Sequence, residues 1–201
     1  TLGLSVLAVG IVDGIAEATA NLTKVASGYV SDRIGRRKPL VLLGYGLAAL
    51  SKPLFPLAAG LVPILAARLS DRIGKGIRGA PRDALIADVT PPEIRGRAFG
   101  LRQALDTAGA FVGPLAAIGL MVLFASDIRL VFWVAVVPAF VSVSLVLFAV
   151  AEPAPAPGGE RPAGLRFAEL GQFGRAFWSV IAIAVLFTLA RFSEAFLVLK
   201  A

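Results

Sequence analysis

Long apolar stretches, separated by short charged or proline-rich segments, are the feature that most constrains how this chain can fold. The hydrocarbon core of a bilayer is about 30 Å thick, so a helix needs about 20 mostly apolar residues to cross it. Of the 201 residues, 57% are hydrophobic and 16% are charged, and a soluble domain of that composition would expose large apolar patches. We therefore predict an all-α integral membrane protein, a polytopic helical bundle with about six spans. The expected spans cover residues 2–27, 40–55, 61–87, 98–125, 130–151 and 176–198.

Residues 68–88 are ambiguous, because their many charged side chains would also suit a long cytosolic loop. If they formed a cytosolic loop, one crossing over 40–67 would leave a basic cluster outside, against the positive-inside bias. A further crossing over 61–87 keeps both basic clusters on the same side. We therefore expect a multi-pass protein of a bacterial-type cytoplasmic (inner) membrane. The segments placed in the cytoplasm are 28–39, 88–97 and 152–173.

The absence of cysteine and histidine limits the chemistry of the chain. Without them there is no disulfide, no thiolate metal site and no imidazole proton switch. We expect no metal and no cofactor, so proton transfer falls to carboxylates or lysines. No serine stands beside a plausible base either, which argues against an enzyme acting on lipid. The net charge of +7 lies in basic clusters at span ends, which favours membrane orientation over nucleic-acid binding.

Ionisable side chains recur inside the predicted spans, where they are costly unless they are paired or face water. Helical spacing places Asp13, Glu17, Asn21 and Lys24 in one stripe of the first span. The third span carries Arg68, Asp71, Arg72, Lys75, Arg78 and Arg82 on one broad face, and the fourth adds Arg102, Gln103 and Asp106. These charges could form structural pairs, such as Asp106 with Arg78, or line a water-filled path. The cationic excess of the third span favours the path, because a purely structural bundle gains little from so many desolvated charges.

A second pattern lies in the fourth predicted span. Gly109 and Gly113 have a spacing that lets helix backbones approach closely in lipid. Pro114 follows directly and leaves a carbonyl group unpaired, which can bend a helix. The spacing alone favours ordinary tight packing, and a hinge is the alternative.

The run at 28–38, Gly-Tyr-Val-Ser-Asp-Arg-Ile-Gly-Arg-Arg-Lys, resembles the signature that the major facilitator superfamily carries between its second and third helices. Glycine, aspartate, glycine and a basic cluster recur there at this spacing. Residues 72–80 are similar to the family's helix-four motif, with Lys75 and Arg78 where Gln and Gly are more usual. Residues 109–114 are similar to the helix-five motif associated with antiporters, followed by two alanines where glycines are common.

This resemblance implies about six spans of a twelve-span fold, covering helices two to seven. Residues 1–151 would form an N-terminal transmembrane bundle that lacks its first helix, since the chain begins at Thr1 without a signal peptide. Residues 152–173 would be a cytoplasmic linker with a short amphipathic segment, and 174–201 the first helix of a C-terminal bundle. The implied partners are the lipid bilayer and the missing remainder of the chain.

The resemblance and the buried charges together predict a secondary active transporter that works by alternating access, with proton-coupled efflux of a small molecule as the leading hypothesis. A uniporter or symporter of an anionic metabolite and a non-transporting membrane scaffold are the alternatives. A carboxylate removed from water is easier to protonate. The candidate residues are Asp13, Glu17 and Asp106 for proton coupling; Asn21, Arg72, Lys75 and Arg78 for the substrate pathway; Gly28, Asp32, Arg33, Gly35 and Arg36 for a cytoplasmic gate; and Gly109, Gly113 and Pro114 for packing or a hinge.

Overall fold

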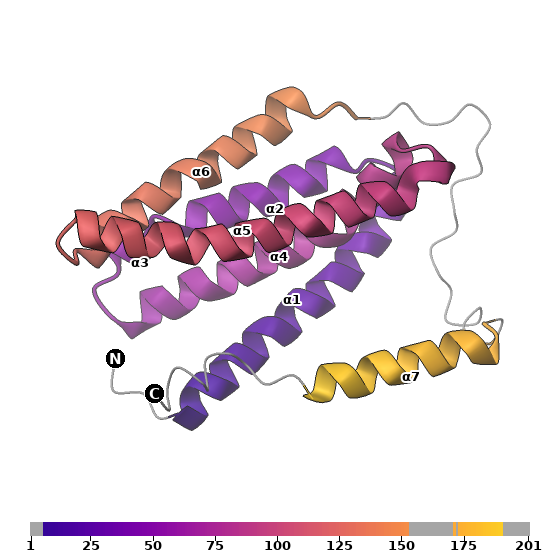
Figure 1. Cartoon of the computed structure of the whole chain (residues 1–201), viewed down its shortest axis with the longest axis horizontal. Helices are drawn as coiled ribbons and strands as arrows, with labels where there is room; N and C mark the ends of the chain where they lie inside the picture. The colour runs from indigo at the N-terminus through magenta and orange to yellow at the C-terminus, as the bar shows by residue number, and fades with distance from the viewer. Residues whose placement is uncertain (1–5, 153–170, 172, 191–201) are drawn as a thin grey trace.

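The computed structural model describes residues 6–152, 171 and 173–190, and every regular element within them is a helix (Figure 1). In chain order these are α1 (Val6–Ile34), α2 (Lys38–Ser51), α3 (Leu54–Leu57), α4 (Leu61–Val89), the short 3-10 helix η1 (Pro92–Ile94), α5 (Arg95–Leu123), α6 (Ile128–Ala149) and α7 (Arg175–Ala190). The predicted all-α bundle is therefore confirmed.

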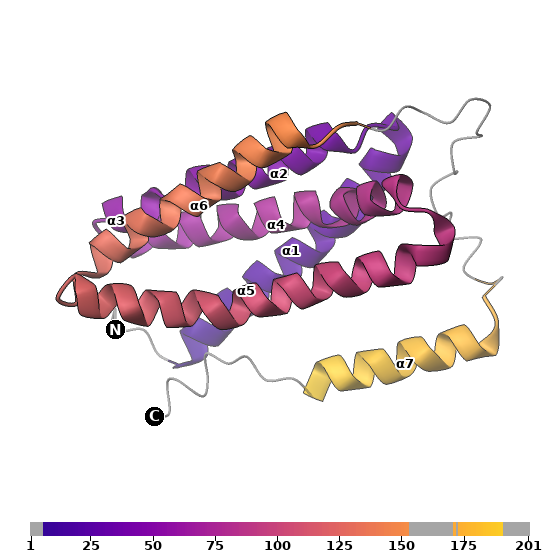
Figure 2. The same cartoon turned by 45° about the horizontal axis from the view of Figure 1, so that its top comes forward.

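Helix α4 packs against both α1 and α2, which run in opposite directions (Figures 1 and 2). The ion pairs Asp13–Arg68 and Lys24–Asp83 advance together along α1 and α4, so these two helices are parallel. Because a short turn at 35–37 joins α1 to α2, α2 returns antiparallel to both. The charged face of α4 is thereby held against the charged stripe of α1.

Glycines allow these three helices to approach closely. A Cβ atom on Gly44 of α2 would lie 2.7 Å from the carbonyl oxygen of Gly74 in α4. A Cβ atom on Gly76 would lie 2.5 Å from the carbonyl oxygen of Ala20 in α1, and 2.7 Å from the Cβ of Thr23. A larger residue at Gly44 or Gly76 would push the helices apart. Among the residues whose burial the structure describes, the buried apolar side chains are those of Ala16, Ala20, Val41, Ala48, Ala49, Ala67, Leu85 and Val146.

Helix α6 packs on α2 and α3, whereas α5 and α7 lie at the outside (Figure 2). The rings of Phe55 and Phe132 stack with their centroids 5.8 Å apart. Lys38 Nζ donates to the carbonyl oxygen of Leu147 at 2.8 Å. No residue of α5 is buried, and α7 lies apart from α2, α4 and α6 in both views.

Three stretches of the described residues are long and apolar enough to cross a membrane: Lys38–Leu57, Pro92–Leu123 and Ile128–Ala149. Helices α1 and α4 contain 29 residues each, or about 43 Å at 1.5 Å per residue. They have the length of a span, and charged side chains run along both of them.

Two segments predicted as loops, 28–39 and 88–97, are largely helical. Helix α1 extends into the first of them and ends at Ile34, before Gly35, whose φ of 69° lies in the left-handed region that glycine favours at a helix end. Helix α4 ends at Val89, and α5 already begins at Arg95. Charged residues mark where the apolar stretch ends, but they do not end the helix. The backbone hydrogen bonds of a helix also form in water.

The predicted span 40–55 is divided, since α2 ends at Ser51 and the separate α3 begins after Pro53. Proline lacks a backbone donor, so it disrupts the helix at this end. The predicted linker and amphipathic segment, together 152–173, lie almost wholly outside the described residues. So does the end of the predicted sixth span, 191–198.

Candidate translocation site

The charged faces of α1 and α4 meet side by side. Arg68 forms an ion pair with Asp13. Arg72 Nη1 donates to Glu17 Oε2 at 3.0 Å, and Lys75 Nζ lies 3.8 Å from Glu17 Oε1. The side chain of Asp13 is 18% exposed and that of Glu17 is 52% exposed, so Glu17 is the more accessible of the two acids. The structure thus sets the predicted proton-carrying carboxylates of α1 against the predicted cationic pathway of α4.

The stripe continues along α1 beyond these pairs. Asn21 lies between Glu17 and Lys24 and is exposed. Lys24 Nζ lies 3.7 Å from Asp83 Oδ2 of α4. The faces that helical spacing assigned to α1 and α4 therefore contact each other over several turns.

Asp106 and Arg78 each contact a partner other than the one suggested by the sequence. Asp106 Oδ2 forms an ion pair with Arg102 Nη2 on the same helix, at 2.7 Å. The suggested ion pair between Asp106 and Arg78 is therefore not formed. Arg78 instead places its guanidinium 4.6 Å from the ring centroid of Tyr45 in α2, because the tight contact at Gly44 brings these helices together.

Arg37, in the turn between α1 and α2, connects the ends of two helices. Its Nη1 atom pairs with Asp32 and donates to Ser31 Oγ at 2.9 Å, both in α1. Its Nε atom donates to Asp88 Oδ2 of α4 at 3.3 Å. Burial by itself would lower the pKa of Arg37, but the hydrogen bonds and charges of Asp32 and Asp88 outweigh burial and raise that pKa. The guanidinium is thus a fixed cation at this end of the bundle.

Glu152, just beyond α6, is attached to the same turn. Its Oε1 accepts from the backbone N–H of Arg37 at 2.6 Å, and its Oε2 accepts from that of Lys38 at 2.8 Å. These donors lie at the N-terminus of α2, where the helix dipole favours a carboxylate. We call this group of Ser31, Asp32, Arg37, Asp88 and Glu152 the Arg37 cluster; it ties together one end of α1, α2, α4 and α6.

The other predicted gate residues surround the Arg37 cluster. Gly28 packs on α4, where a Cβ atom would lie 3.1 Å from the Cβ of Ala80. Arg33, Gly35 and Arg36 are exposed. Of the predicted gate, Asp32 alone enters the cluster through its side chain.

The predicted packing residues of α5 face open space. A Cβ atom on Gly109 or Gly113 would meet no atom of the described residues within 4 Å. Helix α5 continues through Pro114. A packing role for these glycines therefore needs a partner other than the described helices.

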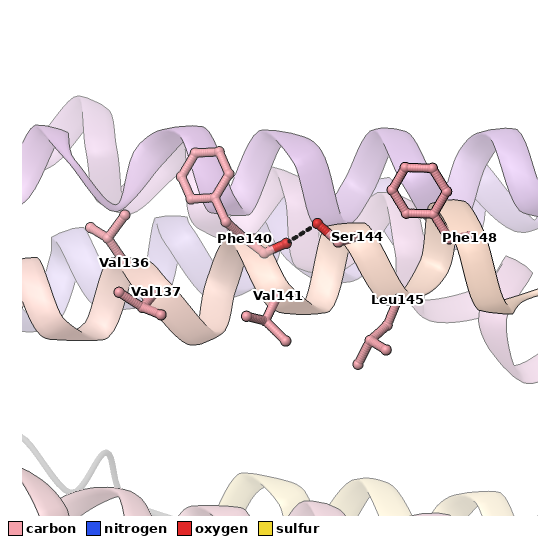
Figure 3. A pocket seen from close by; sticks show the side chains of 7 residues that line it. All are labelled: Val136, Val137, Phe140, Val141, Ser144, Leu145 and Phe148. Atoms are coloured by element: carbon pink, nitrogen blue, oxygen red, sulfur yellow. Dashed lines mark hydrogen bonds between the residues drawn. The ribbon is translucent and has the colours of Figure 1, made fainter.

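An open groove on α6 lies outside the charged site (Figure 3). Its lining is apolar except for Ser144, whose Oγ donates to the carbonyl oxygen of Phe140 at 3.0 Å. Such a surface suits lipid or another helix, and it offers no group that would orient a polar solute. The groove is lined by Val136, Val137, Phe140, Val141, Ser144, Leu145 and Phe148.

Sequence reasoning missed the central member of the cluster. Arg37 lies in a run of basic residues, and spacing does not distinguish it from Arg36. Glu152 follows the fifth span directly, but which helix it would cap depends on packing. The close approaches at Gly44 and Gly76 were also missed, although small residues within spans are the signal that could have found them.

Replacing Arg37 by Gln should loosen the Arg37 cluster. The carboxylates of Asp32 and Asp88 would lose their shared cation, and we expect a loss of about 1–2 kcal/mol, reduced by their partial exposure. Thermal unfolding of the purified full-length protein measures this effect. Arg36→Gln is the matched control, because Arg36 is exposed. Equal unfolding temperatures for the two variants would show that the cluster does not stabilise the bundle.

The family model described as Major Facilitator Superfamily matches residues 1–199. The chain belongs to this superfamily. It is therefore a member of a family of multi-pass membrane transporters, and not an enzyme.

Relatives within the Major Facilitator Superfamily are also similar in sequence. An uncharacterized MFS-type transporter of Methanocaldococcus jannaschii is 31% identical over 100% of this chain and 49% of its own length. Multidrug resistance protein MdtH of Photorhabdus laumondii is 32% identical over 57% of this chain and 28% of its own length. The chain thus spans about half the length of the first of these relatives, and less of the second.

Solved structures show the same fold. The crystal structure of peptide transporter POT in complex with sulfate superimposes with a TM-score of 0.66 at 22% identity. The match covers 98% of this chain and 42% of that protein. At this identity the likeness concerns the fold alone.

Proposed function

We propose that this chain is part of a longer secondary active transporter, which works by alternating access and exports a small molecule in exchange for protons. The observation that carries the proposal is the pairing of Asp13 and Glu17 with cations of α4 inside two span-length helices. The multidrug resistance relatives support the direction of transport.

The pairs provide a physical means of coupling. When Glu17 is ionised, it holds Arg72 and Lys75. Protonation would remove that attraction and free both cations to repel each other or to attract a solute. A proton could thereby change which state of the transporter is favoured, because it interacts differently with the two states.

A non-transporting scaffold would have no need for accessible charges. Yet the side chains of Glu17 and Lys75 are 52% and 53% exposed, and Asn21 beside them is exposed too. Desolvated charges contribute little to a purely structural bundle. Exposed, paired charges are better suited to a hydrated path.

The Arg37 cluster would lie on the cytoplasmic side of a bacterial-type inner membrane, since most basic turn residues gather at that end. In this proposal residues 1–151 belong to the N-terminal bundle, 152–173 to the linker and 174–201 to the C-terminal bundle. The remainder of the chain would supply the second bundle, and the bilayer would surround both.

Asp32→Asn should lower transport while leaving expression intact. The substitution removes the charge that Arg37 binds and that would hold the cytoplasmic gate closed between transport strokes. Substrate flux and the amount of membrane-inserted protein are measured side by side. Normal flux in Asp32→Asn would exclude this residue from the gate.

The proposal is tested by flux of radiolabelled substrate in proteoliposomes that contain the full-length protein. An imposed pH gradient should drive substrate movement against its own gradient. Flux that is independent of pH would leave uniport as the mechanism.

A further inference from the structure

A cationic cluster between α4 and α5 is separate from the pairs that the proposed proton coupling uses. Asp83 lies at its centre. Its Oδ1 is 3.5 Å from Arg82 Nε and 3.7 Å from Arg102 Nε, and its Oδ2 is 3.7 Å from Lys24 Nζ. None of these three contacts is a hydrogen bond, so the carboxylate is attracted by the cations and is not locked to any of them.

The cluster contains buried polar atoms that lack a hydrogen bond within the described residues. They are Arg78 Nη1, Arg82 Nε, Arg102 Nε and Asp83 Oδ1. Leaving such groups unpaired costs free energy, and native structures seldom tolerate it without a reason. Three of the four atoms are guanidinium nitrogens, which donate hydrogen bonds. The cluster therefore lacks acceptors for these donors.

The charge of the cluster also favours a ligand with acceptor atoms. Three cations, Lys24, Arg82 and Arg102, lie near the single carboxylate of Asp83, and Arg102 also pairs with Asp106. The site also remains accessible, because the side chains of Arg82 and Arg102 are 23% and 27% exposed. Their Nε atoms are buried against Asp83 Oδ1, so a small acceptor molecule would reach these donors by displacing the Asp83 carboxylate.

We propose that Arg82 and Arg102, supported by Arg78, bind a small oxyanion that carries a carboxylate or a phosphate. The guanidinium edge formed by Nε and a terminal nitrogen matches the two oxygens of such a group. Asp83 is the internal anion that occupies these cations until the ligand displaces it. The inference rests on the proposed transport function and deepens it, because it assigns the substrate class.

Calorimetric titration of the full-length protein in detergent tests the site, with inorganic phosphate and succinate as separate probes. We expect at least one probe to bind, and its identity tells phosphate from carboxylate. Arg82→Gln and Arg102→Gln should each raise the dissociation constant about tenfold or more, because each removes a charge-assisted hydrogen bond. Arg97→Gln should bind as the unchanged protein does, since Arg97 is an exposed arginine of the same helix as Arg102.

Asp83→Asn supplies a result that misfolding cannot imitate. Removing the competing carboxylate should tighten binding of the probe several-fold, whereas a damaged protein would bind more weakly. Absence of binding by both probes, equal affinity in Arg82→Gln and Arg97→Gln, or weaker binding in Asp83→Asn would overturn the proposal.

These titrations need no gradient, so the two proposals can fail separately. Oxyanion binding with pH-independent flux would retain this site and remove proton coupling. Proton-driven flux without binding of either probe would retain proton coupling and remove the oxyanion site.

Discussion

Glu17→Gln and Asp13→Asn are expected to reduce proton-driven substrate flux to the level of empty liposomes, while counterflow exchange of substrate continues. Both substitutions remove a titratable proton and keep the size of the side chain. Exchange needs only binding and the rocking of the transporter, whereas net coupled flux also requires a proton to be taken up and released. The measurement is flux in proteoliposomes with and without an imposed pH gradient.

Glu17→Gln should have the larger effect of the two. Glu17 contacts both Arg72 and Lys75, and it is the more exposed acid, so it can exchange protons with the hydrated path. Asp13 is more shielded and is held by Arg68. Its replacement should also leave the Arg68 guanidinium without that counter-charge, which adds a cost to folding.

Glu93→Gln is the matched control for these variants. Glu93 is an exposed carboxylate in η1, away from the α1–α4 pairs. It should leave coupling unchanged. Full coupling in both Glu17→Gln and Asp13→Asn would mean that another residue carries the proton. The α1–α4 ion pairs would then not be responsible for coupling.

The fold could be predicted from the sequence to the extent that bilayer physics determines it. The length of each apolar stretch and the position of each basic cluster indicate how often the chain crosses the membrane. The helical repeat also identified the faces of α1 and α4 that carry charge. Hydropathy did not indicate where the helices end, because Gly35 and Pro53 determine those ends through backbone geometry.

The partners within the site were harder to predict, because they depend on distances between helices. Spacing placed Asp13 and Glu17 on one stripe and Arg72 on one face of another helix, but it could not tell that these faces meet or that Asp106 would bind Arg102 on its own helix. Nor could it distinguish Arg37 from the other basic residues of its run. That choice follows from the meeting of Asp32 and Asp88 at one turn, which is a result of packing.

Close packing at the glycines is what brings these charges to their partners. The contact between Gly44 and Gly74 sets the distance from α2 to α4, and it therefore places Arg78 over Tyr45. The contact at Gly76 sets the distance from α1 to α4, on which the pairs of Glu17 depend. The backbone contacts and the electrostatics of the site are consequently linked.

Gly44→Ala is therefore expected to destabilise the bundle markedly. The added Cβ would lie 2.7 Å from the carbonyl oxygen of Gly74 and from the backbone nitrogen of Arg78. Neither atom can rotate away, so α2 and α4 must separate. Overpacking of this kind costs about 1–3 kcal/mol and sometimes more, and the apparent unfolding temperature of the full-length protein in detergent should fall by several degrees.

Gly46→Ala isolates the steric effect from the effect of helix propensity. Gly46 lies two residues further along the same helix, and a Cβ there would meet no atom of the described residues within 4 Å. Both substitutions favour the helix to a similar degree, so Gly46→Ala should unfold at the same temperature as the unchanged protein or slightly above it. If Gly44→Ala also left the unfolding temperature unchanged, α2 and α4 would have to lie further apart than the structure places them. The position of Arg78 over Tyr45 would then lose its support.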